Sequence, residues 1–210
     1  MKKLNDLIHS LDSLAKISKL GKAQKIKLKR AGDYYKRGVN YYNQKQYDKA
    51  ISDFTEAIKI NPKYANFYKG RGMAYFVQNN YDKAILDYNK AIEINPKSAG
   101  AYYHRGLAYY FQNNYDKAIS DYSNAIEINL IFVEDYDNRG IAYVKLDQYD
   151  KAVLDYIKTL DKNPKATLAY NNRAVAKFQL GDKSGACQDW RKAEELGYKK
   201  AHEMIKKYCE

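Results

Sequence analysis

The sequence of 210 residues is short of the side chains that most often carry chemistry or cross-links, with two cysteines, three histidines and one tryptophan. Two cysteines exclude a disulfide-rich scaffold and a four-cysteine zinc site, and they are typical of a reducing compartment. The three prolines and 11 glycines argue against an all-β sandwich, which needs many turns. No stretch approaches the roughly 18 apolar residues of a membrane-spanning helix. We therefore expect no catalytic site, no metal, no cofactor and a cytoplasmic location.

What the sequence does contain is an internal repeat with one fixed period and no insertions. One column of small residues is Gly38, Gly72, Gly106, Gly140 and Ala174. A second small column is Ala50, Ala84, Ala118, Ala152 and Ala186. A column of large aromatic residues is Phe54, Tyr88, Tyr122, Tyr156 and Trp190. A column of tyrosines is Tyr34, Tyr68, Tyr102, Tyr136 and Tyr170. We therefore expect five copies, at 31–64, 65–98, 99–132, 133–166 and 167–200.

Each copy has the periodicity of two helices. In the second copy, apolar residues recur at helical spacing from Tyr68 to Phe76 and again from Tyr81 to Ile92, on either side of a short polar turn. Proline at position 96 ends the second helix, because proline disfavours helical geometry in the residue before it. One such hairpin cannot bury both of its faces, so the copies must stack into an α-solenoid.

Over residues 31–200 this pattern resembles the tetratricopeptide repeat family, in its 34-residue period and in its order of Tyr, Gly, Tyr, Ala, large aromatic residue, Ala and Pro. The resemblance implies an all-α fold: a right-handed α-solenoid of helix-turn-helix repeats with an N-terminal helix and a C-terminal capping helix. It also implies a non-catalytic scaffold that binds a protein or peptide. Most of the 23 tyrosines fall in framework columns, which favours packing between helices over stacking on nucleic-acid bases.

Two charged columns lie about half a period apart, on opposite helices of each hairpin. We expect ion pairs within or between adjacent copies, because arginine forms bidentate pairs with carboxylates. The alternative is five arginines that bind phosphate. The candidate pairs are Arg37 with Asp53, Arg71 with Asp87, Arg105 with Asp121, Arg139 with Asp155, and Arg173 with Asp189.

The formal net charge is +12, and most of this excess lies in residues 1–30. Apolar residues recur at helical spacing from Leu4 to Leu20, and a dense run of lysines follows. We expect a basic amphipathic helix or segment over 1–30, with a break near Gly21. It caps the first repeat, lies on an anionic membrane or forms a seam with a partner helix. Polar residues interrupt its apolar stretch, so it is no signal peptide.

At the other end, residues 201–210 have the spacing of a capping helix. Cys187 and Cys209 can meet only if this helix folds back on the fifth copy, and spacing alone does not show that. We therefore expect two buried, reduced thiols. At the end of the third copy, the apolar residues 130–133 replace the usual Asn-Pro-Lys turn. They either bury against the fourth copy or form an exposed knob that docks a partner.

In the family, the first helix of each copy lines a concave groove, and this resemblance supplies the candidate binding residues. They are Tyr35, Val39, Tyr42, Lys69, Met73, Phe76, Tyr103, His104, Leu107, Tyr110, Asn138, Ile141 and Asn172. The alternative for the aliphatic column Val39, Met73, Leu107, Ile141 and Val175 is packing between neighbouring helices. Family members that grip acidic chaperone tails use Lys, Asn and Arg at positions that here hold Tyr35, Val39, Gly70, Gly100 and His104, so this carboxylate clamp is missing. Asn138 and Asn172 could form a short asparagine ladder that holds a peptide backbone.

We therefore predict a scaffold that binds a protein or peptide segment in its groove in preference to nucleic acid. Two alternatives remain open. The basic segment 1–30 could mediate association with nucleic acid or an anionic membrane, or the chain could be a regulatory subunit of an enzyme complex.

Overall fold

The structure is a computed structural model, and it describes residues 21–129 and 133–210. These ranges contain eleven helices and no strand, as the period predicts. The helices are α2 (Lys22–Asn43), α3 (Tyr47–Ile60), α4 (Ala65–Val77), α5 (Tyr81–Ile94), α6 (Ala99–Phe111), α7 (Tyr115–Ile128), α8 (Val133–Lys145), α9 (Tyr149–Lys162), α10 (Thr167–Gln179), α11 (Lys183–Glu195) and α12 (Ala201–Tyr208).

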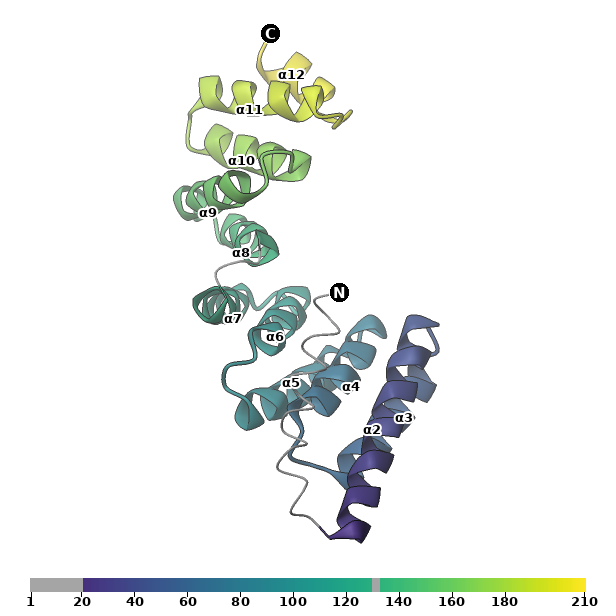
Figure 1. The fold of residues 1–210 in the computed structure, drawn as a ribbon. Coiled ribbons are helices and arrows are strands. Elements are labelled where there is room, and N and C mark those ends of the chain that lie inside the picture. The colour runs from purple at the N-terminus through teal and green to yellow at the C-terminus, as the bar shows by residue number, and fades with distance from the viewer. Residues whose placement is uncertain (1–20, 130–132) are drawn as a thin grey trace.

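Consecutive helices pair into five hairpins, and each hairpin packs against the next along the chain. Figure 1 shows them stacked in chain order into an elongated, curved array that runs from α2 at one end to α12 at the other. The fold is the right-handed α-solenoid that the repeat predicts. The hairpins are α2 with α3, α4 with α5, α6 with α7, α8 with α9, and α10 with α11.

A three-residue turn joins the two helices of every hairpin, and its middle residue has a left-handed backbone. These residues and their φ angles are Lys45 (60°), Asn79 (59°), Asn113 (59°), Asp147 (56°) and Gly181 (86°). The next residue donates its N–H to a carbonyl five residues earlier, as from Asn80 to Tyr75 at 2.9 Å. This bond satisfies a carbonyl at the end of the first helix. The turn therefore repeats with the same period as the helices.

The glycine column marks where the two helices of a hairpin approach most closely. A Cβ atom on Gly72 would lie 2.7 Å from Cε1 of Tyr88, and one on Gly106 would lie 2.9 Å from Cε1 of Tyr122. Both rings are buried, and so is the alanine four residues before each of them. The small residues thus leave the space that the aromatic column fills, and the core runs through the array as a chain of such contacts.

Arginine ties the two helices of every hairpin together. In all five pairs, Nε and one terminal nitrogen of the arginine donate to both carboxylate oxygens of the aspartate 16 residues later, at 2.6–2.8 Å. In the middle copies the third nitrogen also reaches back to the preceding copy. Arg71 donates to Thr55 at 3.0 Å, and Arg139 donates to Ser123 at 2.9 Å. One guanidinium therefore joins three helices.

The C-terminal helix α12 folds back onto α11, and a disulfide joins Cys187 to Cys209. The prediction of two reduced thiols is therefore wrong. It failed because the repeat period carries no information on where the last helix turns. Trp190 and Tyr208 stack beside the bridge, with their ring centroids 5.8 Å apart. Because the cysteines are paired, the composition argument for a reducing compartment loses its basis.

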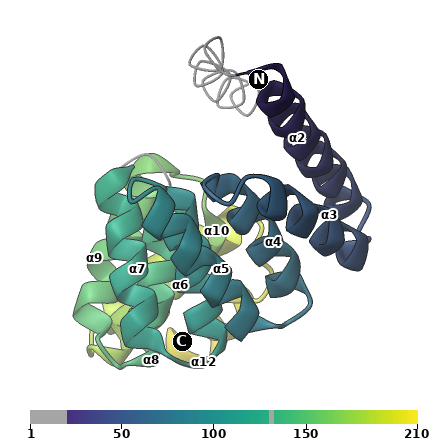
Figure 2. The same cartoon turned by 90° about the horizontal axis from the view of Figure 1, so that it is seen from below.

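At the N-terminal end, α2 begins at Lys22, directly after Gly21, so the first helix of the array starts before residue 31. Figure 2 shows the early turns of α2 projecting beyond the stacked hairpins. The amphipathic stretch from Leu4 to Leu20 lies outside the described residues, and so do residues 130–132 of the apolar segment. The alternatives for both segments stay predictions.

Candidate functional site

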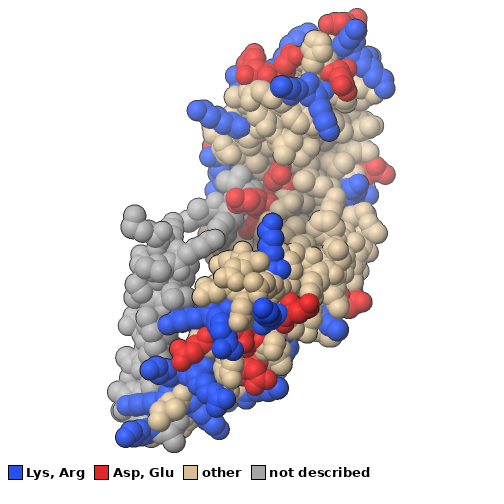
Figure 3. Space-filling view, turned by 90° about the vertical axis from the view of Figure 1, so that its right-hand side faces the viewer, with Lys and Arg blue, Asp and Glu red and all other residues tan. Residues whose placement is uncertain are grey.

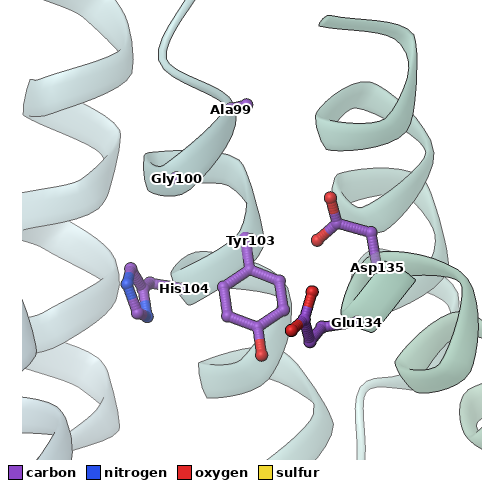
Figure 4. A pocket seen from close by; sticks show the side chains of 6 residues that line it. All are labelled: Ala99, Gly100, Tyr103, His104, Glu134 and Asp135. Carbon is purple, nitrogen blue, oxygen red and sulfur yellow. The ribbon is translucent and has the colours of Figure 1, made fainter. Parts of the chain in front are cut away.

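The first helices of the hairpins contact one another along the array at α2–α4, α4–α6 and α8–α10. Between α6 and α8 lies a cavity of about 340 Å³. Among the described residues, its lining comes from these two first helices and consists of Ala99, Gly100, Tyr103, His104, Glu134 and Asp135. Figure 4 shows the Tyr103 ring between His104 on one side and the two acidic side chains on the other.

On either side of the cavity, the predicted aliphatic column packs inward. Val39, Met73, Leu107, Ile141 and Val175 are all half-buried and lie against the aromatic and alanine core. Tyr35 also belongs largely to the core, because its ring packs 5.3 Å from that of Phe67. Burial raises the pKa of Tyr35 to about 12. These residues shape the groove more than they offer free surface to a partner.

The aromatic residues near the end of each early first helix pair with the residue that opens the second helix. The ring centroids lie 5.6 Å apart for Tyr42 and Tyr47, 5.5 Å for Phe76 and Tyr81, and 5.4 Å for Tyr110 and Tyr115.

Phe111 joins the Phe76 and Tyr81 rings, stacking on Tyr81 at 5.6 Å, and half of its surface remains exposed. Val77 is also exposed. An apolar, accessible cluster of Phe76, Val77, Tyr81 and Phe111 therefore stands where the second and third copies meet.

Within the cavity, α6 supplies aromatic and neutral groups. The Tyr103 hydroxyl accepts a hydrogen bond from the Asn138 amide at 3.2 Å. The His104 ring stacks on Tyr88 with centroids 5.9 Å apart. Burial, with a smaller contribution from Lys69, lowers the pKa of His104 to about 4, so this ring is neutral near pH 7.

The α8 side of the cavity is acidic. Asp135 is only 2% exposed, and its Oδ2 has no hydrogen-bond partner among the described residues. Burial and the neighbouring Glu134 charge raise the pKa of Asp135 to about 7, against an opposing effect of Arg139. Burial and Glu134 also raise the pKa of Asp137, whose Oδ1 is likewise buried and unpaired within the described ranges. Figure 3 shows acidic side chains gathered at this height of the array, between ends where Lys and Arg are more numerous.

Sequence reasoning missed Asp135. One period before it stands Ala101 and one period after it Ala169, both buried, and Phe67 holds the same position in the second copy. An acid in a column that is otherwise apolar in the inner copies was the signal that could have found it. The carboxylate is buried because the inner copies bury that position, whereas Asp33 at the same position of the first copy is exposed.

The remaining predicted positions are dispersed. Asn138 points its amide at Tyr103, and Asn172 accepts a hydrogen bond from Asn171 at 3.4 Å. The two asparagines that could form a ladder therefore already contact neighbouring side chains. Lys69 lies near the cavity, with Nζ 3.8 Å from the place a Cβ atom on Gly100 would occupy.

Among 21–129 and 133–210, no group of three or more His, Cys, Asp or Glu side chains is arranged to hold a metal ion. In the same ranges no helix is both long enough and apolar enough to cross a membrane.

Known protein families and solved structures match this sequence and fold. A family model described as TPR repeat matches residues 72–113, and models described as tetratricopeptide repeat match 33–64, 99–129 and 138–196. Among solved structures, MamA is 27% identical with a TM-score of 0.74, over 79% of this chain and 96% of MamA. A sequence search of curated proteins gives no significant match.

Two more distant structures share the fold alone. YrrB, described as a TPR protein with an unusual peptide-binding site, is 18% identical with a TM-score of 0.74, over 82% of this chain and 90% of YrrB. PilF of Pseudomonas aeruginosa is 17% identical with a TM-score of 0.71, over 81% of this chain and 78% of PilF. Since the family models together match well over half of the sequence, the chain belongs to the tetratricopeptide repeat family.

Proposed function

We propose that this chain is a non-catalytic scaffold that holds a protein or peptide segment in the groove formed by its first helices. The observation that carries the proposal is the cavity between α6 and α8, whose described lining residues all lie on first helices. A concave site with apolar walls and a few polar groups is the usual form of a binding site. The tetratricopeptide fold is in general one of protein-interaction scaffolds.

The exposed apolar cluster supports the same proposal. Phe111 is 53% exposed and Val77 is 39% exposed. Aromatic side chains held rigidly at a surface give a partner large apolar contact at little cost in conformational entropy. The groove thus offers an apolar anchor site where the second and third copies meet, and one copy further along a cavity that carries two carboxylates. An extended segment with side chains of both kinds would suit it.

The binding mode that we propose differs from the carboxylate clamp of chaperone-binding relatives. A clamp needs cations that face a terminal carboxylate, and here the first helices present Tyr35, Gly100 and a neutral His104 at the corresponding positions. The nearby Glu134 and Asp135 would repel an acidic tail.

A peptide selection tests the proposal. Random dodecapeptides displayed on phage are selected against the full-length chain, and enriched sequences are measured by calorimetry. Replacing the exposed Phe111 by serine should weaken their binding by about fivefold or more, as expected for an apolar anchor. The matched control is Leu86→Ser, because Leu86 is 67% exposed but lies on the second helix α5.

Enrichment that depends on Phe111 and not on Leu86 supports the groove. Failure to enrich any peptide, or equal losses from the two variants, would reject it.

A further inference from the structure

Asp135 is a buried carboxylate at a position where the adjacent copies carry alanine. Its position belongs to a column where the neighbouring copies bury Ala101 and Ala169, yet here the framework buries a carboxylate. One oxygen of that carboxylate, Oδ2, has no partner within the described parts of the chain, and Asp135 is one of the residues that line the cavity. Burying an unpaired acid costs stability. Such a violation of local rules is typical of a functional position.

The charged groups around Asp135 do not satisfy it. Arg139 is the cation of the same helix that acts on it, but all three of its nitrogens are engaged, two with Asp155 and one with Ser123. Glu134 adds a second negative charge to the cavity wall, and Asp137 adds a third nearby. From α6, His104 brings no charge at neutral pH. From α4, Lys69 brings a cation to the neighbourhood of Gly100.

The other wall of the cavity suits a flat cation. Tyr103 presents its ring between the two helices, opposite the carboxylates (Figure 4). Ala99 and Gly100 add almost no side-chain bulk. Guanidinium groups form bidentate hydrogen bonds with carboxylates and stack on aromatic rings. The space of about 340 Å³ is ample for one long side chain.

The geometry points to this cavity as the binding site for an arginine side chain of the partner segment. The guanidinium would donate to the carboxylates of Asp135 and Glu134, with its plane against Tyr103. This inference rests on the proposed function, because it names the chemistry of the segment that the groove holds. No metal is part of it, since the described residues form no three-ligand group.

A small probe tests the pocket without a known partner. N-acetyl-arginine amide is titrated into the isotope-labelled full-length chain, and backbone amide resonances are followed. We expect saturable shifts confined to residues 99–104 and 134–138. N-acetyl-citrulline amide, which has almost the same shape but no charge, should leave them unmoved. Equal shifts with citrulline would overturn the inference, and equal shifts with N-acetyl-lysine amide would overturn the assignment to arginine.

Two variants separate the pocket from general charge effects. Asp135→Ala introduces the residue that the adjacent copies carry, so the fold should tolerate it, and it should abolish the shifts caused by the arginine probe. Glu127→Gln removes one exposed negative charge from α7, outside the cavity, and should leave those shifts intact. Binding that survives Asp135→Ala would reject the pocket.

The selected peptides then distinguish this inference from the proposed function. We expect them to contain arginine, and Asp135→Ala should weaken their binding by about tenfold or more, as for loss of one partner from a buried ion pair. The same variant should have no effect once that arginine is replaced by citrulline in the peptide. Peptides that depend on Phe111 but not on Asp135 would support the scaffold and reject the arginine pocket. Binding of the arginine probe with no enriched peptide would support the pocket and reject the peptide scaffold.

Discussion

Arg105 donates two hydrogen bonds, 2.7 and 2.6 Å long, to the two carboxylate oxygens of Asp121. A third nitrogen of the same guanidinium donates to Asn89, on the second helix of the preceding copy, at 2.6 Å. The pair therefore holds a hairpin closed and also fixes it to its neighbour. Asp121 is almost fully buried, so solvent screens this interaction little.

Removal of the Asp121 carboxylate should accordingly destabilise the array. We expect Asp121→Ala to lower the free energy of unfolding by about 3 kcal/mol, because it leaves the Arg105 charge partly buried without its partner. Asp53→Ala is the matched control. Its partner Arg37 has a side chain that is 56% exposed, so water can replace the lost carboxylate there. Equal losses in chemical denaturation of the two variants would contradict this account.

The close approach of Gly72 to Tyr88 gives a second prediction. A Cβ atom at position 72 would come within 2.7 Å of the buried ring, so Gly72→Ala should cost about 2 kcal/mol through forced displacement of the helix pair. Gly32→Ala is the control, since nothing lies within 4 Å of a Cβ atom there and α2 continues through it. That variant should gain about 0.5 kcal/mol from alanine's higher helix propensity. Thermal unfolding of both would show opposite signs.

Two groups at the cavity have opposing effects on the pH dependence of stability. Burial raises the pKa of Asp135 from 3.8 to about 7, so the folded chain binds this proton more tightly than the unfolded chain does. The contribution of Asp135 to the free energy of unfolding therefore falls as the pH rises from 3.8 to about 7. Burial lowers the pKa of His104 from 6.5 to about 4, so the unfolded chain binds this proton more tightly than the folded chain does. The contribution of His104 to the free energy of unfolding therefore grows as the pH rises from about 4 to 6.5.

In the wild type the two effects partly cancel between about pH 4 and 6.5. Asp135→Ala should therefore unfold with a stability that climbs more steeply with pH over this window, and it should exceed the wild type most clearly above about pH 7. Urea midpoints measured across this range check both statements. A variant curve parallel to the wild-type curve would show that Asp135 titrates normally.

The disulfide gives a fourth prediction. It links two cysteines at a sequence separation of 22 near the C-terminal end, which corresponds to about 3 kcal/mol in the chain-entropy account. Dithiothreitol should lower the melting temperature of the wild type. Cys209→Ser should melt at the lower temperature with or without the reductant. Hydrogen exchange should locate the loss in α11 and α12. An unchanged melting temperature on reduction would show that the bridge does not contribute.

Most of the fold could be predicted from the spacing of the repeated residues. A glycine, an alanine and a large aromatic residue recur in one register, so the hairpin, its close contact and its stacking all follow from spacing. The arginine and aspartate columns follow in the same way, because their constant separation brings each pair to facing positions on the two helices of a hairpin.

The spacing could not predict the features that depart from the 34-residue period. Asp135 could not be predicted in this way, because a repeat identifies the residue type that the copies share and not a departure in one copy. The effect of burying this acid also depends on its neighbours from α6. The pairing of Cys187 with Cys209 depends on the direction in which α12 leaves the last copy. The extension of α2 back to Lys22 lies before the first periodic residue, where no column constrains it.

The left-handed turn residue at Lys45, with its counterpart in each later copy, has a consequence for the modularity of the chain. Every hairpin closes with the same turn and packs chiefly against the hairpins beside it. The array can therefore be shortened or lengthened by one whole copy. Joining residue 64 directly to residue 99 would bring α6 next to α3 with the same small and aromatic residues in register. Such a shortened protein should fold into four hairpins, and its cavity between α6 and α8 would survive one step nearer the N-terminus.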